Sequence, residues 1–394
     1  MFFAATERPL SSASSSGSEG SAYASESEFE SGTGDAWRLG RLGGPSAREA
    51  SALKLAGHQG VAPDAAPGTT PSADAARPLS ARFHTAFDKS QGATNVRCAH
   101  GAPHVTVGSF DGGVRTYDTN SGTRIFSQPA LTNGTGAACL DVRYRPPRDN
   151  AAGHVLYASY SDGSLHSYHV TSERRLTSAS IGSAAAYSLD LSKAGDQIAL
   201  GCEDAVVRVL DERTLGEVCS LKGGHANRIN AVRFSPDDPK ALASAGWDNT
   251  LRVWDVRSGK LTFTAMGAYV CGDAVDVRGQ YVLAASWRTS RQLEVFDLRG
   301  GDGAAAVHCL EFVPSNAAEL GRVYTASFAH ALSDKTGRLH IAAGGGRRFR
   351  LFDLAAGAVV ADFDAGDTVH GHSFSPDGAF VALGLSTGVC ALGV

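Results

Sequence analysis

Two groups of residues have the types that hydrolytic chemistry uses. Ser386 lies at the centre of residues 384–388, Gly-Leu-Ser-Thr-Gly, which match the G-x-S-x-G elbow that presents a nucleophilic serine. That elbow needs a strand before it and a helix after it, but only six residues follow the motif, and they have a strand pattern. His225, Ser244 and Asp248 are the three residue types of a Ser-His-Asp triad. Whether either group is catalytic depends on the elements that carry it.

Two other groups have residue types that could bind a phosphate or a metal ion. Residues 344–348, Gly-Gly-Gly-Arg-Arg, could surround a phosphate, but they lack the Lys-Ser/Thr of a Walker motif and a following helix. We interpret them as a tight turn between strands. His370 and His372 have no Cys or carboxylate companions at metal-ligand spacing. The sequence therefore predicts a protein that is not an enzyme and that needs no cofactor and no metal.

Composition limits the classes of partner. The net charge is -4, and the chain after residue 78 is nearly neutral, with 31 acidic and 30 basic side chains. This balance gives no electrostatic reason to expect nucleic acid as a partner. No window of 18 residues is uncharged and apolar, so we expect no membrane span. The seven cysteines include no C-x-x-C pair, which favours reduced thiols in an intracellular protein, cytoplasmic or nuclear.

The first 78 residues differ from the rest in composition. Residues 11–31 contain ten serines and few large apolar side chains, and Ala, Gly, Pro and Ser continue to about residue 78. Such a segment cannot bury enough apolar surface to offset its chain entropy. We expect residues 1–78 to be a disordered Ser/Ala/Gly-rich tail and residues 79–394 to form the folded domain.

A repeat organises residues 79–394. Short alternating strands recur, and one strand in each unit ends in a large apolar residue that is usually followed by Asp. These strand ends are Tyr117-Asp118, Tyr168-His169, Leu210-Asp211, Trp254-Asp255, Phe296-Asp297, Phe352-Asp353 and Leu392-Gly393. Their spacings of 51, 42, 44, 42, 56 and 40 residues suit four strands per unit, with insertions near residues 146–150 and 300–322. The sequence therefore predicts seven units.

Residues 223–260 carry a close resemblance to one repeat of the WD-repeat β-propeller family. They contain Gly224-His225, a turn Asp248 and the strand end Trp254-Asp255. The resemblance implies an all-β, seven-bladed WD-repeat β-propeller. It also implies that His225, Ser244, Asp248 and Trp254 form the structural tetrad of a blade, with no substrate cleft beside them. The same alignment places Ser386 at a turn, so neither serine is expected to be a nucleophile.

The ends of the chain predict how the ring closes. The last residues, 389–394, correspond to the third strand of the seventh unit, which leaves a sheet edge that needs a partner. Residues 81–87, before the first full unit, have strand character. We expect this N-terminal strand to complete the last blade.

The resemblance also implies a partner-binding face at one end of the ring. In WD-repeat proteins this face is lined by residues at the turn before the Asp and by those that enter the innermost strand. Carried over to this chain, these positions are Trp247, Arg228, Phe110, Glu203, Trp287, Arg288, Arg347 and Arg348. Tryptophan and arginine are frequent anchors of protein interfaces. We therefore expect a monomeric propeller that acts as a protein-binding scaffold or adaptor within a complex.

A second resemblance supports an alternative function. Residues 254–257, Trp-Asp-Val-Arg, match the W-D-x-R box of WD-repeat receptors that dock onto cullin-RING ubiquitin ligases. The D-x-R element recurs in the flanking units. Its members are Asp255 and Arg257, Asp211 and Arg213, and Asp297 and Arg299. The alternative is thus a substrate receptor of such a ligase.

Overall fold

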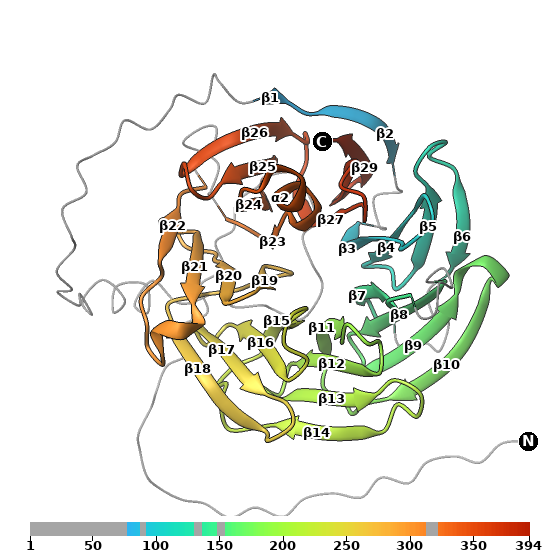
Figure 1. Cartoon of the computed structure of the whole chain (residues 1–394). Coiled ribbons are helices and arrows are strands. Elements are labelled where there is room, and N and C mark those ends of the chain that lie inside the picture. The colour runs from blue at the N-terminus through green and yellow to red at the C-terminus, as the bar shows by residue number, and fades with distance from the viewer. Residues whose placement is uncertain (1–76, 87–91, 130–135, 148–153, 313–321) are drawn as a thin grey trace, which may run out of the picture. The chain divides into compact units, whose positions relative to one another are not determined.

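Seven β-sheets form a ring. The computed structural model describes residues 77–86, 92–129, 136–147, 154–312 and 322–394 (Figure 1). Residues 1–76, almost all of the predicted tail, lie outside the described residues. In each blade four strands pair with their neighbours in antiparallel order, from the centre of the ring to its rim. The predicted all-β, seven-bladed propeller is confirmed.

Blades 1 to 4 each take four consecutive strands. Blade 1 contains β3 (Ala93–Cys98), β4 (His104–Ser109), β5 (Val114–Asp118) and β6 (Arg124–Gln128). Blade 2 contains β7 (Cys139–Tyr144), β8 (Val155–Tyr160), β9 (Ser164–His169), the 3-10 helix η2 (Val170–Ser172) and β10 (Arg174–Ser180). Blade 3 contains β11 (Ala186–Leu191), β12 (Gln197–Cys202), β13 (Val207–Asp211) and β14 (Glu217–Leu221). Blade 4 contains β15 (Ile229–Phe234), β16 (Ala241–Gly246), β17 (Thr250–Asp255) and β18 (Lys260–Met266).

Blades 5 to 7 follow the same plan with additions. Blade 5 contains β19 (Val275–Arg278), β20 (Tyr281–Ala285), β21 (Leu293–Asp297), the 3-10 helix η3 (Leu298–Gly300) and β22 (His308–Leu310). Blade 6 contains β23 (Thr325–Phe328), the helix α2 (His330–Thr336), β24 (His340–Gly345), β25 (Arg348–Asp353) and β26 (Ala358–Asp364). Blade 7 contains β27 (Val369–Phe374), β28 (Phe380–Leu385), β29 (Gly388–Gly393) and β2 (Ser80–Ala86).

The core lies between the blades. The second strands β8, β24 and β28 are buried at every position, whereas most of the outer strand β10 is exposed. Second strands are sandwiched between neighbouring blades, so apolar and small side chains occupy both of their faces. Rim strands are covered on fewer sides, which explains their alternation of buried and exposed residues.

The two ends of the described chain meet in blade 7. Strand β2 pairs antiparallel with β29, with Ala81 opposite Leu392 and Ala86 opposite Gly388. Phe83 packs against the apolar cluster between blades 7 and 1, and Thr85 Oγ1 donates to Gly122 O of blade 1 at 3.1 Å. The predicted closure by an N-terminal strand is therefore confirmed.

A second contact of the same segment was not predicted. Residues 77 and 78, which the sequence analysis assigned to the tail, form β1 (Arg77–Pro78). This strand pairs in parallel with the rim strand β26 of blade 6. The segment that closes blade 7 therefore also adds a fifth strand to the neighbouring blade (Figure 1).

Helix α2 is the other unexpected element. The long spacing of 56 residues was attributed to an insertion at residues 300–322, but β22 lies within that range and α2 accounts for part of the excess. Seven residues are too few to produce a clear 3.6-residue pattern, so the helix left no signal in the sequence. No helix in the described part of the chain is long and apolar enough to cross a membrane.

Removal of the closing strand should open the ring. Deleting residues 79–86 exposes the edge of β29, so we expect oligomers or a melting temperature lower by at least about 10 °C. Size-exclusion chromatography and thermal unfolding check this. The milder variant Phe83→Ala should lower the melting temperature while leaving a monomer. A deletion variant that remains monomeric and equally stable contradicts the role of β2.

Candidate functional site

Blade 4 contains a buried hydrogen-bonded chain of four side chains. Trp254 Nε1 donates to Ser244 Oγ at 2.8 Å, and Ser244 Oγ lies 2.7 Å from His225 Nε2. His225 Nδ1 lies 2.8 Å from Asp248 Oδ2. Burial works against ionisation of Asp248, but the hydrogen bond and charge of His225 outweigh it, so the pKa of this carboxyl lies below its usual value. Ser244 is fully buried, so these residues connect the strands of the blade and cannot meet a substrate.

Ser386 lies in a different place. It occupies the turn between β28 and β29, so a strand and not a helix follows it. Its Oγ lies 2.9 Å from His370 Nε2, and burial lowers the pKa of His370 to about 4. The backbone N–H of Ser386 donates to Thr368 O at 3.2 Å, so the turn is tied to the residue before β27. The hydrogen bond between Ser386 and His370 joins the turn between β28 and β29 to the innermost strand β27 of blade 7.

Trp247 anchors the first half of the expected partner-binding face. Its ring stacks on Tyr269 with centroids 5.8 Å apart, and the guanidinium of Arg228 lies 3.1 Å from the ring centroid on Trp247. Arg228 Nη1 also donates to Tyr187 Oη at 3.1 Å. Arg228 is only 6% exposed, so it lies beneath the surface, whereas sequence analysis placed it on the exposed end. Trp247 is half-buried and held rigidly between two neighbours.

A second cluster continues around the same end of the ring. Trp287 contacts Tyr324 edge-to-face at 4.9 Å, and Arg322 lies 4.8 Å from the Trp287 ring centroid. Tyr324 contacts His370 at 5.3 Å, and His370 contacts Phe110 of blade 1 at 6.1 Å. We call the two clusters together the aromatic face. Its members are Phe110, Tyr187, Arg228, Trp247, Tyr269, Trp287, Arg322, Tyr324 and His370.

Sequence reasoning missed five of the nine members of the aromatic face, namely Tyr187, Tyr269, Arg322, Tyr324 and His370. Tyr269 is the counterpart in blade 5 of Arg228 in blade 4, because each accepts a backbone hydrogen bond from its turn tryptophan. Tyr324, His370 and Tyr187 likewise lie at or near the start of an innermost strand. The sequence therefore contained the information needed, because the residue at the start of each innermost strand could have been identified in every repeat.

The other predicted face residues have different surroundings. Arg288 is engaged by the buried carboxylate of Glu294 and donates to Arg291 O, so it stabilises its own loop. Arg347 is exposed near Asp364, and Arg348 lies 3.5 Å from Asp362. Glu203 is exposed at the turn of blade 3.

The D-x-R residues lie at the end of the third strands that is opposite the aromatic face. Asp255 accepts hydrogen bonds from the backbone of Arg257 and Ser258, and these amides lower the pKa of its carboxyl. Asp211 and Asp297 accept the same kind of bond in their own blades. The aspartates therefore stabilise turns, while the arginines Arg213, Arg257 and Arg299 are exposed.

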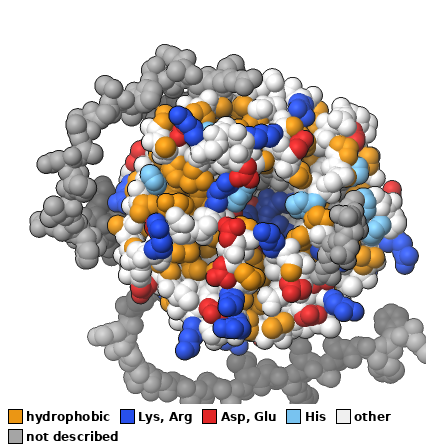
Figure 2. All heavy atoms as spheres, viewed as in Figure 1, with side chains coloured by type: hydrophobic (Ala, Val, Ile, Leu, Met, Phe, Trp, Pro, Cys, Tyr) orange, Lys and Arg blue, Asp and Glu red, His pale blue; other side chains and the backbone are white. Residues whose placement is uncertain are grey.

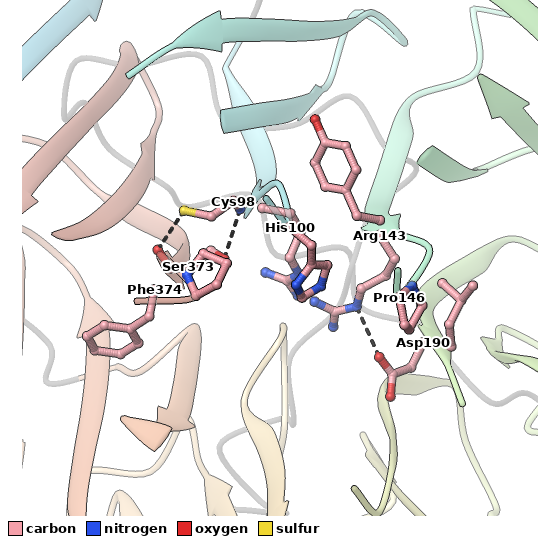
Figure 3. Close-up of a pocket in the computed structure, with 11 residues that line it drawn as sticks. Cys98, His100, Arg143, Pro146, Asp190, Ser373 and Phe374 are labelled. Carbon is pink, nitrogen blue, oxygen red and sulfur yellow. Dashed lines mark hydrogen bonds and ion pairs between the residues drawn. The ribbon is translucent and has the colours of Figure 1, made fainter. Parts of the chain in front are cut away.

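A buried ion cluster fills the centre of the ring. Asp273 accepts hydrogen bonds from Arg97 of blade 1, Arg143 of blade 2 at 3.2 Å, and Arg233 of blade 4. Each arginine is the next-to-last residue of its innermost strand, so the three guanidiniums meet at one level. Two contiguous cavities, of about 270 and 330 Å³, border the cluster. Figure 3 shows His100 and Arg143 side by side in one of them, with Arg143 paired to Asp190.

A bulge in blade 5 places Asp273 in this position. In blade 4, regular pairing resumes at Ala231, three positions after the backbone contact at Arg228. In blade 5, the equivalent residue Ala274 comes five positions after the backbone contact at Tyr269. The two additional residues extend the segment toward the centre of the ring and bring the carboxylate of Asp273 to the arginines. No sequence pattern indicated this cluster.

The described residues include no group of three or more His, Cys, Asp or Glu side chains that could hold a metal ion.

Replacement of Asp273 should destabilise the ring. In Asp273→Ala, three guanidiniums lose their shared carboxylate, and we expect the free energy of unfolding to fall by about 3–5 kcal/mol. Urea unfolding measures this, with the exposed Asp302→Ala as control. A loss below about 1 kcal/mol would mean that the cluster contributes little net stability.

Comparisons with known proteins agree with this architecture. The family model described as "WD domain, G-beta repeat" matches residues 216–255. The U3 small nucleolar RNA-associated protein 21 homolog of Schizosaccharomyces pombe is 28% identical over 44% of this chain and 20% of its own length. Autophagy-related protein 16 of Arabidopsis thaliana is 26% identical over 40% of this chain and 30% of its own length.

A third relative is the guanine nucleotide-binding protein subunit beta-5b of Danio rerio, which is 32% identical over 29% of this chain and 27% of its own length. The matches thus span less than a third of each of these three relatives. They assign no subfamily. The seven sheets, the buried hydrogen-bonded chain of blade 4 and these matches agree with the resemblance to the WD-repeat β-propeller family, and one repeat of the ring, residues 216–255, matches the family model itself.

Proposed function

We propose that this propeller is a non-catalytic scaffold or adaptor that binds a protein partner on its aromatic face. The observation that carries the proposal is the pair of clusters of aromatic and arginine side chains at that end of the ring, which the backbone hydrogen bond from Trp287 to Tyr269 joins. These residue types dominate binding energy at protein interfaces because they combine large contact area with directional donors. The stacking of Trp247 between Arg228 and Tyr269 fixes its ring before a partner arrives, which reduces the entropy lost on binding.

The names of the relatives support the proposal. They include a ribosome biogenesis protein of Pyricularia oryzae and a ribosome assembly protein of Chaetomium thermophilum, matched over 27% and 9% of this chain. Proteins named for assembly are consistent with a propeller that works within a complex. They also support an intracellular location, nuclear or cytoplasmic. Within the described part of the chain, the two candidate serines form hydrogen bonds inside blades 4 and 7, Ser244 with Trp254 and His225 and Ser386 with His370.

Affinity purification with quantitative mass spectrometry tests the proposal. The variant Trp247→Ala should reduce capture of the main partner at least about tenfold, because it removes the central ring of the face. Glu203→Lys, which reverses a charge at an exposed turn at the same end of the ring, should also weaken capture without disturbing that stack. Met266→Ala, at an exposed rim position, is the control. If both variants capture the same proteins as the wild type, the interface does not lie on the aromatic face.

A second candidate function is a substrate receptor of a cullin-RING ubiquitin ligase. It is favoured by the three exposed arginines that follow the third strands of blades 3, 4 and 5, namely Arg213, Arg257 and Arg299. These side chains lie at the same turn of neighbouring blades and could together contact an acidic adaptor surface.

Arg257→Ala separates the two candidates. Under the ligase hypothesis it should reduce co-purification of a cullin complex at least about tenfold while the fold stays intact. Arg174→Ala, an exposed arginine of the rim strand β10, is the matched control. If wild-type protein captures no cullin complex, the second candidate is wrong.

A further inference from the structure

At the aromatic face, each blade has one residue whose backbone carbonyl meets the turn after the second strand. We call it the entry residue, because the innermost strand begins soon after it. In blades 4 and 5 the entry residues are Arg228 and Tyr269, whose carbonyls accept the backbone N–H of Trp247 and Trp287. The entry residues of blades 1, 2, 3 and 7 are small and uncharged, namely Gly92, Ala138, Ala185 and Thr368.

Arg322 is the entry residue of blade 6. A Cβ added to Gly345 would collide with Arg322 O, just as a Cβ added to Gly246 would collide with Arg228 O. These two glycines hold the same place, since each is the last residue of the second strand of its blade. Three consecutive blades, 4 to 6, therefore present Arg228, Tyr269 and Arg322 in that order. The positive charge of the entry residues is confined to this part of the ring.

Arg228 is a buried cation without a carboxylate partner. Its Nη1 donates to Tyr187 Oη, whereas Nη2 has no acceptor among the described residues. Five arginines are buried in the described part of the chain, and the other four each pair with an aspartate, namely Arg97, Arg115, Arg143 and Arg350. The rings of Trp247 and Tyr187 lie against the guanidinium of Arg228. Such contacts offset only part of the cost of a buried charge, so this arginine lacks a counter-charge.

Arg322 also lacks a carboxylate partner, and it is exposed. Its guanidinium lies 4.8 Å from the centroid of the Trp287 ring and forms no ion pair with any residue that the structure describes. Glu203 and Asp367 lie at the same end of the ring but pair with neither arginine. A guanidinium that rests on a ring by one face keeps the donors of its edge for a planar carboxylate.

Cys271 shows that the two arginines act on one place. Burial raises the pKa of this thiol, while a hydrogen bond with Trp247 and the positive charges of Arg228 and Arg322 lower it. No carboxylate of the described residues is among the groups that act on it. The opposite end of the ring, which Figure 2 shows, carries acidic and basic side chains next to one another. Blades 4 to 6 of the aromatic face thus have positive charge that the fold does not balance.

We propose that the entry residues of blades 4 to 6 bind an acidic segment of the protein partner, with an Asp or Glu carboxylate on Arg322. Arg228 adds a second positive charge from beneath Trp247. This inference rests on the proposed function, and it names the chemistry of the partner and the blades that the partner contacts. Opposite charges of this kind mainly steer the encounter and fix the register of an interface.

Site-specific cross-linking in the full chain identifies the bound segment. Thr289 is exposed in the same turn as Trp287, so p-benzoyl-L-phenylalanine at this position reports what lies on the face. Mass spectrometry should find a cross-linked peptide whose Asp and Glu residues outnumber its Lys and Arg residues. A neutral or basic peptide, or one whose negative charge comes only from phosphorylation, overturns the proposal. If no protein is cross-linked, the proposed function itself is wrong.

A synthetic peptide with the cross-linked sequence is the probe for the variants, with fluorescence anisotropy as the measurement. Arg322→Glu should weaken binding at least about tenfold through like-charge repulsion. Arg322→Lys keeps the charge and should bind more tightly than Arg322→Glu, although it lacks the planar fork. Replacement of each Glu and Asp of the peptide by Gln and Asn should weaken binding to the wild type as well. Arg174→Glu, an equal charge change on the exposed rim strand β10, is the control and should bind as the wild type does.

Two outcomes of this titration contradict the acidic partner. In one, Arg322→Glu is folded by circular dichroism and binds the peptide with wild-type affinity. In the other, Arg174→Glu loses as much affinity as Arg322→Glu, since binding then follows net charge and not this part of the face. Trp247→Ala, measured beside them, separates the two levels of the argument. If it weakens binding while Arg322→Glu does not, the aromatic face remains the interface and only the acidic chemistry is wrong.

Discussion

One carboxylate shared by three guanidiniums joins four blades at the centre of the ring. The blades are separate sheets that meet mainly through apolar side chains, and such packing is non-directional. Asp273 adds a directional contact at the centre, because it joins blade 5 to blades 1, 2 and 4. Buried charges are costly unless they are paired, so these four groups constrain one another strongly. Asp141, Asp190 and Asp276 add directional contacts between neighbouring blades, because each accepts a backbone N–H from the next blade.

The ionic cluster also makes the two ends of the ring different from each other. At one end the ionic cluster borders a polar cavity that His330 and Ala331 of α2 help to line, and at the other lie the half-buried or buried rings of the aromatic face. The two surfaces share the innermost strands, which begin at the aromatic face and end at the arginines. Residues Tyr269 to Ala274 connect them directly, because this segment starts beneath Trp247 and then carries Asp273. Only a few covalently linked residues therefore separate the Trp247 stack at one end of the ring from the ionic cluster at the other.

Those features that repeat could be predicted from the sequence. The spacing of strand ends gave seven blades, the unpaired last strand indicated closure by residues 81–87, and the residue types of blade 4 indicated its buried side-chain chain. Features that interrupt the repeat could not be predicted. The bulge before β19 and the seven-residue helix α2 are single insertions without a period of their own, and their positions depend on contacts with distant blades. The burial of Arg228 could not be predicted for a related reason, since only the folded structure shows that the Trp247 ring covers its guanidinium.

The pairing of β2 with β29 has a consequence for the order of folding. These strands are separated by about 300 residues, and contacts of such high sequence separation form slowly because a long loop must close first. Blades 1 to 6 contain four strands each from nearby sequence and can assemble in turn as the chain emerges. Blade 7 has to wait for the last of its strands. Until then residues 80–86 remain without their partner, and the nascent ring exposes two sheet edges that a second chain could pair with.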